Sequence, residues 1–275
     1  MEVFQMPKLI SANFYRVFHS KLFWIMLIAA PIPNIYVILE DFFENMDYYM
    51  QAVKADFDLN FIFQEHMLTF SHNEYMGFLI ALLTGLLIGE EFSHGTFRNK
   101  MICGCTRTTV YLSYFLTIWG AVLILHLVAI LIPILLAFMM FGVSFKGIGT
   151  FLIYVLYSTI PMGTLTAVML FIIGLIREKA LGTAITLVIA FIMMFIASNT
   201  ETELVYSERY TRDELMKQAF LERIQPNGYF RQIFIPEFYA EIHLFDMTPP
   251  PLTCGLLGLA FLTAGILIFR KTNLK

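Results

Sequence analysis

The chain has 275 residues, of which 58% are hydrophobic and only 14% are charged. Soluble domains average about 25% charged residues, and a soluble fold of this size could not hide so much apolar surface from water. The composition therefore predicts a membrane protein. Three cysteines are too few for a disulfide framework, and the sequence has no basic stripe or motif for nucleic acid.

Residues 1–21 carry apolar side chains at helical spacing, among them Leu9, Ile10, Phe14 and Val17. This pattern predicts a short amphipathic helix on the membrane surface. The alternative is that these residues are only the polar start of the first membrane span. A cleaved signal peptide is disfavoured, because the apolar run 22–39 is long enough to span and no small-residue cleavage site follows it.

Apolar runs along the chain predict six transmembrane helices. They are expected at 22–39, 75–88, 114–141, 150–176, 180–198 and 252–269. Pro31 and Pro33 should kink the first span, which membrane helices tolerate. The third span would be about 42 Å long at 1.5 Å per residue, so it must tilt, kink at Pro133 or protrude. We expect a single all-α integral membrane domain.

The polar segments differ in charge on the two sides of this predicted bundle. Residues 1–21, 89–113, 177–179 and 270–275 hold 11 of the 18 Lys and Arg but only 4 of the 21 Asp and Glu. Segments 40–74, 142–149 and 199–249 hold the remaining charges and are mostly acidic. Because basic loops mark the cytoplasmic side, both termini and segment 89–113 are expected in the cytoplasm. The sizeable segment 199–249 would lie outside.

Segment 89–113 concentrates polar groups between two apolar spans. Thr96 is expected to cap a short helix that ends near Ile102, and Gly104 to stop it in a left-handed conformation. Thr106 or Thr108 would then cap the third span. Together these signals predict a short helix lying across the cytoplasmic face, between spans two and three.

The sequence lacks the patterns by which a membrane transporter would obtain energy by itself. The sequence has no G-x-x-x-x-G-K-[ST] phosphate-binding loop, and the central thirds of the six spans contain no Asp, Glu, Lys or Arg. Neither ATP hydrolysis by that loop nor ion coupling is therefore supported. A transporter of this kind would receive its energy from another subunit at the cytoplasmic face.

One segment resembles a known loop. It consists of Gly89-Glu90-Glu91-Phe92-Ser93-His94-Gly95-Thr96-Phe97-Arg98-Asn99-Lys100, together with 104–107 and 111–112. It is similar to the first cytoplasmic loop of type-2 ABC exporter permeases, in particular the bacterial bacitracin-resistance and lantibiotic-immunity permeases. The resemblance implies a coupling helix that docks an ATPase. The docking residues would then be Glu90, Glu91, Phe92, Gly95, Thr96, Phe97, Arg98, Asn99 and Lys100.

The same resemblance implies the partners. These would be two ABC ATPase subunits, which bind ATP and Mg, a second permease chain that is identical or homologous, and membrane lipid. The chain itself would bind no cofactor and catalyse no reaction, and it would lie in a bacterial plasma membrane. The alternative for segment 89–113 is a solvated loop whose charges only fix topology, although adjacent acids contribute little to orientation.

Other candidate residues carry weaker signals. Spans two and five would line the substrate path, with adaptable apolar walls. The residues expected there are Phe78, Leu82, Thr84, Thr186, Met193, Met194 and Phe195. His126 is either a functional group inside the bundle or a neutral histidine bonded to a neighbouring helix. No metal site and no catalytic residues are expected.

The function that these patterns favour is the permease of an ATP-driven exporter for a peptide, an antibiotic or another amphipathic compound. The alternative is an immunity or accessory membrane protein that binds a toxic peptide without transporting it. An integral-membrane enzyme or ion channel would need buried polar groups, which the predicted spans lack.

Overall fold

The structure, a computed structural model, describes residues 5–44, 72–141, 148–205 and 250–271. Within these residues every regular element is a helix, as the sequence predicts. The helices are α1 (Gln5–His19), α2 (Lys21–Ala29), α3 (Ile32–Glu44), α6 (His72–Ser93), α7 (Thr96–Ile102), α8 (Arg107–Phe141), α9 (Ile148–Ile176), α10 (Lys179–Val205) and α14 (Pro250–Lys271). Most of the predicted outer segments fall outside the described residues.

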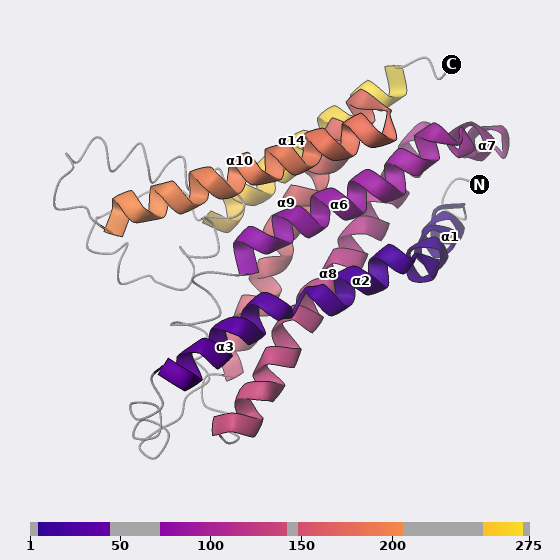
Figure 1. The fold of residues 1–275 in the computed structure, drawn as a ribbon. Coiled ribbons are helices and arrows are strands. Elements are labelled where there is room, and N and C mark those ends of the chain that lie inside the picture. The colour runs from indigo at the N-terminus through magenta and orange to yellow at the C-terminus, as the bar shows by residue number, and fades with distance from the viewer. Residues whose placement is uncertain (1–4, 45–71, 142–147, 206–249, 272–275) are drawn as a thin grey trace.

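The long helices form an elongated bundle (Figure 1). Helices α1 and α7 and the end of α14 lie together at one end of it, at the upper right of the view. Both ends of the described chain are thus on the same side, in agreement with the sequence. The assignment of that side to the cytoplasm stays a prediction.

Four helical segments within the described residues are long and apolar enough to cross a membrane. They are Met76–Ser93, Arg107–Met140, Ser158–Ile176 and Cys254–Lys271. Two shorter apolar segments, Lys21–Tyr36 and Lys179–Met193, lie where the sequence predicts the first and fifth spans. The chain is therefore a helical membrane protein, while the number of six crossings stays a prediction.

The first predicted span is not one kinked helix. Helix α2 ends at Ala29 and α3 begins at Ile32, with Pro31 in the turn between them. Pro31 has no backbone N–H to donate to the preceding helical turn, so the helix is interrupted there. Pro33 is tolerated because it sits in the first turn of α3, where backbone N–H groups have no helical partner in any case.

Helices α6 and α8 extend beyond the predicted spans into the polar segment between them. Helix α6 runs on to Ser93 and so includes Gly89, Glu90 and Glu91, which makes the start of the polar segment helical. Helix α8 begins at Arg107, seven residues before the expected 114. The Thr106 hydroxyl caps it by accepting from the Thr109 backbone N–H at 3.3 Å, one of the two predicted caps.

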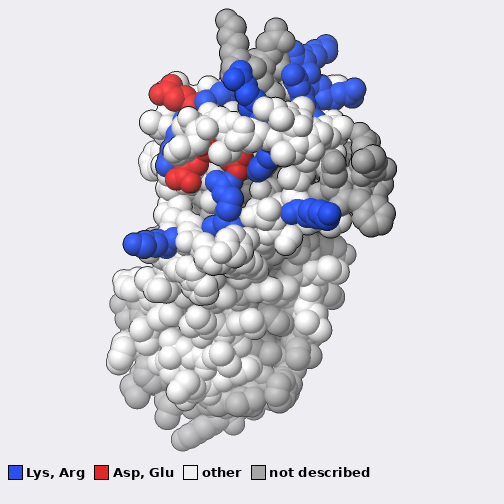
Figure 2. Space-filling model, turned by 90° about the vertical axis from the view of Figure 1, so that its right-hand side faces the viewer, with Lys and Arg blue, Asp and Glu red and all other residues white. Residues whose placement is uncertain are grey.

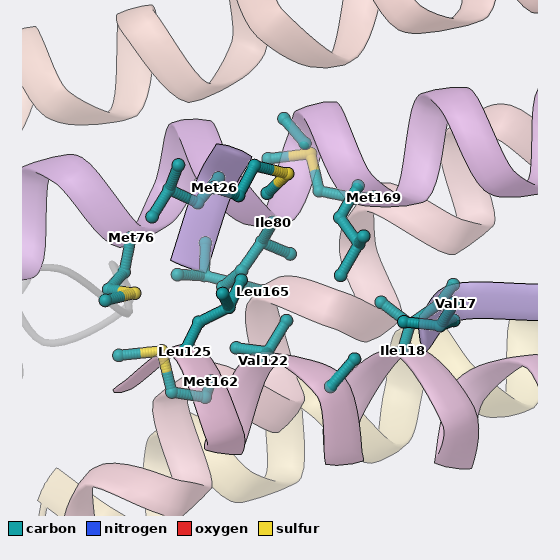
Figure 3. Close-up of a cluster of buried hydrophobic side chains, with 14 of the residues drawn as sticks. Val17, Met26, Met76, Ile80, Ile118, Val122, Leu125, Met162, Leu165 and Met169 are labelled. Atoms are coloured by element: carbon teal, nitrogen blue, oxygen red, sulfur yellow. The ribbon is translucent and has the colours of Figure 1, made fainter. Parts of the chain in front are cut away.

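The hydrophobic core lies between α6, α8 and α9 and is reached from the N-terminal side by α1 and α2. Figure 3 shows part of this cluster. Its labelled residues are Val17, Met26, Met76, Ile80, Ile118, Val122, Leu125, Met162, Leu165 and Met169. Val17 on α1 is therefore a core residue, so the N-terminal helix packs on the bundle as well as carrying a polar face.

Two pairs of helices, α6 with α10 and α9 with α14, approach each other closely at glycines. A Cβ placed on Gly85 of α6 would lie 2.9 Å from the Cα of Thr183 on α10. A Cβ on Gly258 of α14 would lie 3.1 Å from the Cα of Thr164 on α9. Small residues let membrane helices approach until their backbones nearly touch, which compensates for the weak hydrophobic drive within lipid.

The connection from α9 to α10 consists of Arg177 and Glu178 only. Arg177 adopts φ 57°, the left-handed region that side-chain-bearing residues rarely occupy. Its backbone N–H donates to Ile173 O at 2.9 Å and so closes the last turn of α9. The sequence predicts this tight polar connection.

Candidate functional site

Two left-handed glycines delimit α7. Gly95 has φ 63° and separates α7 from α6, while Gly104 has φ 85° and follows its C-terminus. The N–H groups of Gly104 and Cys105 donate to Met101 O at 3.0 Å and Lys100 O at 3.2 Å, the Schellman pattern. The sequence signals thus predict both α7 and the stop at Gly104.

The predicted cap at Thr96 is wrong. Gly95 occupies the N-cap position, and no side chain caps α7. The Thr96 hydroxyl instead donates to Glu91 Oε2 at 2.9 Å. Thr96 is already the first residue inside the helix, so its hydroxyl does not occupy the capping position and donates to the charged carboxylate, a strong acceptor.

Glu91 is the centre of a buried polar cluster. Only 1% of its side chain is exposed. Its Oε1 pairs with the Arg16 guanidinium of α1 and accepts from Lys100 Nζ of α7 at 3.0 Å. Its Oε2 accepts from the Tyr114 hydroxyl of α8 at 2.6 Å, as well as from Thr96. A buried carboxylate needs such partners, and here three helices, α1, α7 and α8, supply them.

Lys100 is the second branching point of the cluster. Its ammonium donates to Asn13 Oδ1 at 3.1 Å and to the Tyr114 hydroxyl at 3.0 Å, in addition to Glu91. Asn13 in turn donates to Ser113 Oγ at 3.3 Å. Burial, together with the nearby Arg16 charge, lowers the pKa of Lys100 to about 8. We call Asn13, Arg16, Glu91, Lys100 and Tyr114 the Glu91 cluster.

Aromatic side chains hold α7 from the other side. Phe97 is buried, and its ring meets that of Phe269 on α14 edge to face at 4.6 Å between centroids. Phe92 of α6 and Tyr111 of α8 join them, at 6.0 Å from Phe97 and 5.3 Å from Phe269. Such aromatic pairs add to the stabilisation from burial alone. Helix α7 thus also packs against the C-terminal end of α14.

The same end of the bundle contains two further polar contacts. Glu90 Oε1 accepts from Lys179 Nζ of α10 at 2.7 Å, and both side chains are substantially exposed. The Arg107 guanidinium donates to the backbone carbonyl of Arg270 at 2.8 Å, close to the end of α14. A cation at a helix C-terminus satisfies carbonyls that have no helical partner.

The outward side of α7 presents a small mixed surface. The exposed residues on α7 and its two flanking turns are Ser93, His94, Gly95, Arg98, Asn99, Ile102, Cys103 and Gly104. Ile102 is 75% exposed. We call Arg98, Asn99 and Ile102 the outer face of α7. Figure 2 shows that the charged side chains lie in the upper half of this view, while the described surface in the lower half carries none.

The nine predicted docking residues do not form one surface. Only Gly95, Arg98 and Asn99 are exposed. Glu91 and Phe97 are buried, and the other four are half-buried. Glu90 and Glu91 bond to neighbouring helices, so in this conformation these acids join α6 to α1, α7, α8 and α10. A docking role for the segment stays a prediction.

The weaker candidates are placed as follows. Thr84 and Thr186 are buried and donate to carbonyls of their own helices, Ile80 O at 2.7 Å and Gly182 O at 3.0 Å. Phe78, Leu82 and Met193 are half-buried, Phe195 is exposed, and the side chain of Met194 lies outside the described residues.

His126 lies inside the bundle. It is buried on α8, and its Nε2 lies 2.5 Å from Ser158 Oγ on α9. This contact matches the second expectation for His126, a histidine bonded to a neighbouring helix.

Sequence reasoning missed Arg16, Asn13, Tyr114 and Lys179 as members of this site. Asn13 and Arg16 are three residues apart, so they share one face of α1. The apolar Val17 lies next to these two polar residues in the helix, and this mixture was the one sequence signal that the face contacts the bundle.

Comparison with known proteins agrees with this architecture. Residues 9–193, well over half of the chain, match the family described as ABC-2 family transporter protein. No curated protein matches the chain. The matched range includes most of α1 and all of α6, α7 and α8, and therefore the whole Glu91 cluster. The chain belongs to the ABC-2 family of transporter proteins.

Proposed function

We propose that this chain is the permease subunit of an ATP-driven exporter and that its ATPase docks on the outer face of α7. Permeases of the ABC-2 family typically work with ATPase partner subunits. The sequence contains no G-x-x-x-x-G-K-[ST] loop, which supports assigning ATP, Mg and hydrolysis to the partner. This chain would then have no catalytic role.

The observation that carries the proposal is the two-sided character of α7. Its inner side is anchored by Phe97 and Lys100, while Arg98, Asn99 and Ile102 point away from the bundle. An exposed apolar residue beside an arginine is typical of the centre of a protein interface. A short helix held firmly on one side and bare on the other is well suited to receive a force.

The cargo that we propose is a peptide, an antibiotic or another amphipathic compound, moved out of the cytoplasm or the membrane. The path would lie between two permease chains in a bacterial plasma membrane. Support comes from the apolar character of α6 and α10, where Phe78, Leu82 and Met193 are partly accessible. The Thr84 and Thr186 hydroxyls bond to their own helices, so contacts with cargo along these helices would be mainly apolar.

The docking proposal can be tested by purifying the tagged chain from its native membranes in mild detergent. We expect a protein with a G-x-x-x-x-G-K-[ST] loop to copurify with the wild type. The double variant Arg98→Glu, Ile102→Asp should lose this protein, because it reverses a charge and places an acid at the apolar contact. Lys8→Glu is the matched control, since Lys8 is exposed on α1 and outside the Glu91 cluster.

Two results would contradict the proposal. One is that no such ATPase copurifies with the wild type, which favours the immunity or accessory protein. The other is that the double variant retains the ATPase at wild-type yield, which would place the docking surface elsewhere. Efflux of an amphipathic fluorescent peptide from ATP-loaded vesicles then tests export, because a binding protein without transport would retain the peptide.

A further inference from the structure

The flanks of α7 would let it move by itself. Gly95 and Gly104 both adopt left-handed conformations, and a Cβ at Gly95 would meet no atom within 4 Å. Glycines tolerate large changes of φ and ψ, so each end of α7 is a potential hinge. A short helix between two such points could swing without disturbing the rest of the bundle.

The Glu91 cluster opposes that independent motion. Lys100 of α7 shares the Glu91 carboxylate with Arg16 of α1, and it also donates to Asn13 of the same helix. Moving α7 away would separate Lys100 from Glu91 and Asn13. The buried Glu91 carboxylate would then have one neighbouring cation fewer. Because unpaired buried charge is costly, the polar groups should move together.

Helix α1 is also seated on α8 by apolar contacts. Val17 is fully buried in the core, and a Cβ placed on Gly120 would lie 2.6 Å from Phe14 Cζ. Asn13 adds a hydrogen bond to Ser113 of α8. These contacts run along one side of α1, so the helix is a packed element and follows the start of α8.

We propose, building on the function proposed above, that Arg16 and Asn13 are positioning residues that join α1 to α7. Displacement of α7 by the ATPase would carry α1 and the start of α8 with it as one body. In this arrangement α1 is a working part of the force-transmitting assembly, in addition to being an anchor at the membrane surface. Helix α7 would not act as a free lever between its two glycines.

The proposal can be tested by measuring distances within the complete complex of permease and ATPase, reconstituted in lipid. Spin labels can be placed on native Cys103 beside α7, on Ala12→Cys in α1 and on Leu256→Cys in α14, all at exposed positions. Two labels are used at a time, and the pairs without position 103 carry Cys103→Ser. Labelled chain is diluted with unlabelled chain, so that distances within one chain dominate. Double electron–electron resonance then measures the distance between the two labels in the nucleotide-free complex and in the complex trapped by ATP and vanadate.

We expect distances 103–256 and 12–256 to change together by at least about 1–2 Å, the size of a typical helix shift. The distance 12–103 should stay constant. If 103–256 changes while 12–256 does not, α7 moves without α1 and the inference is overturned. If neither distance changes although ATP is hydrolysed, α7 is not displaced at all and the proposed function fails as well.

Substitutions separate positioning from folding. Arg16→Gln should abolish the change in 12–256 while preserving the change in 103–256 and the copurification of the ATPase. Arg16→Lys keeps the charge and should restore it, and Lys8→Gln should have no effect. Asn13→Ala is the milder variant if Arg16→Gln does not fold. Wild-type behaviour in both Arg16→Gln and Asn13→Ala would overturn the proposal.

Discussion

Gly85 of α6 lies directly against Thr183 of α10, so closely that a Cβ on Gly85 would be 2.6 Å from Thr183 Oγ1 and 2.9 Å from its Cα. The Cα of Thr183 belongs to the backbone, so it cannot rotate aside as a side-chain atom could. The two helices can keep this contact only if the residue on α6 has no side chain. The same requirement does not apply to every helical glycine in the chain.

Gly85→Ala should therefore push α6 and α10 apart. We expect the free energy of unfolding in mixed micelles to fall by about 1–3 kcal/mol, the usual cost of overpacking. Gly255→Ala is the control, because its Cβ would meet Ile160 Cγ2 at an ordinary 3.7 Å. That control should be neutral or stabilising by up to about 1 kcal/mol, from helix propensity alone. Equal effects at the two glycines would show that the contact is not tight.

Glu91→Ala should be much more damaging than Glu90→Ala. Removing the buried Glu91 carboxylate leaves Arg16 and Lys100 without their counter-charge and the Tyr114 hydroxyl without its acceptor, and breaking a buried pair costs about 3–5 kcal/mol. Glu90 pairs with Lys179 at the surface, where such a pair contributes about 0–1 kcal/mol. Unfolding by denaturant in micelles would measure both. A milder loss for Glu91→Ala than for Glu90→Ala would contradict the buried cluster.

The stability of the protein should depend on the protonation of Lys100. Its pKa is about 8 in the folded protein and 10.5 in the unfolded chain. Between these values the unfolded chain binds more protons, so stability should rise with pH across this window and be flat below pH 8. The unfolding midpoint measured from pH 7 to pH 10 should show the rise. Lys100→Met should flatten it, and an equally steep rise in that variant would assign it to other groups.

Ser158→Ala tests the contact between α8 and α9 inside the bundle. The substitution removes the partner that lies 2.5 Å from His126 Nε2. Hydrogen bonds between membrane helices contribute about 0.6 kcal/mol on average and up to about 1.7 kcal/mol. We expect a loss in that range by equilibrium unfolding. Thr263→Ala, at an exposed hydroxyl that bonds only to Ala260 O of its own helix, should have a smaller effect. A loss no larger for Ser158→Ala than for Thr263→Ala would argue against a stabilising contact.

Local signals predicted α7 well because its ends depend on residues close in sequence. Gly104 stops the helix, and Thr106 caps the next one, through bonds that span three to five residues. The same reasoning failed at Thr96, because the left-handed Gly95 takes the N-cap position one residue earlier and the Thr96 hydroxyl donates to the Glu91 carboxylate. The capping pattern alone did not distinguish these two neighbouring positions.

The Glu91 cluster could not be predicted from the sequence in the same way. Asn13 lies 87 residues before Lys100 and 100 residues before Ser113, and only the packing of α1 against α8 brings them together. Adjacent acids in a basic loop indicated that partners were needed. They did not indicate whether those partners were in another subunit or on the N-terminal helix.

The link of Arg177 and Glu178 constrains how the bundle can change shape. Three peptide units separate Ile176 from Lys179, so their Cα atoms can never be more than about 11 Å apart. The facing ends of α9 and α10 are therefore held within that distance of each other. Since α10 packs on α6 and α9 packs on α14, this short link also limits how far one helix pair can slide lengthwise past the other.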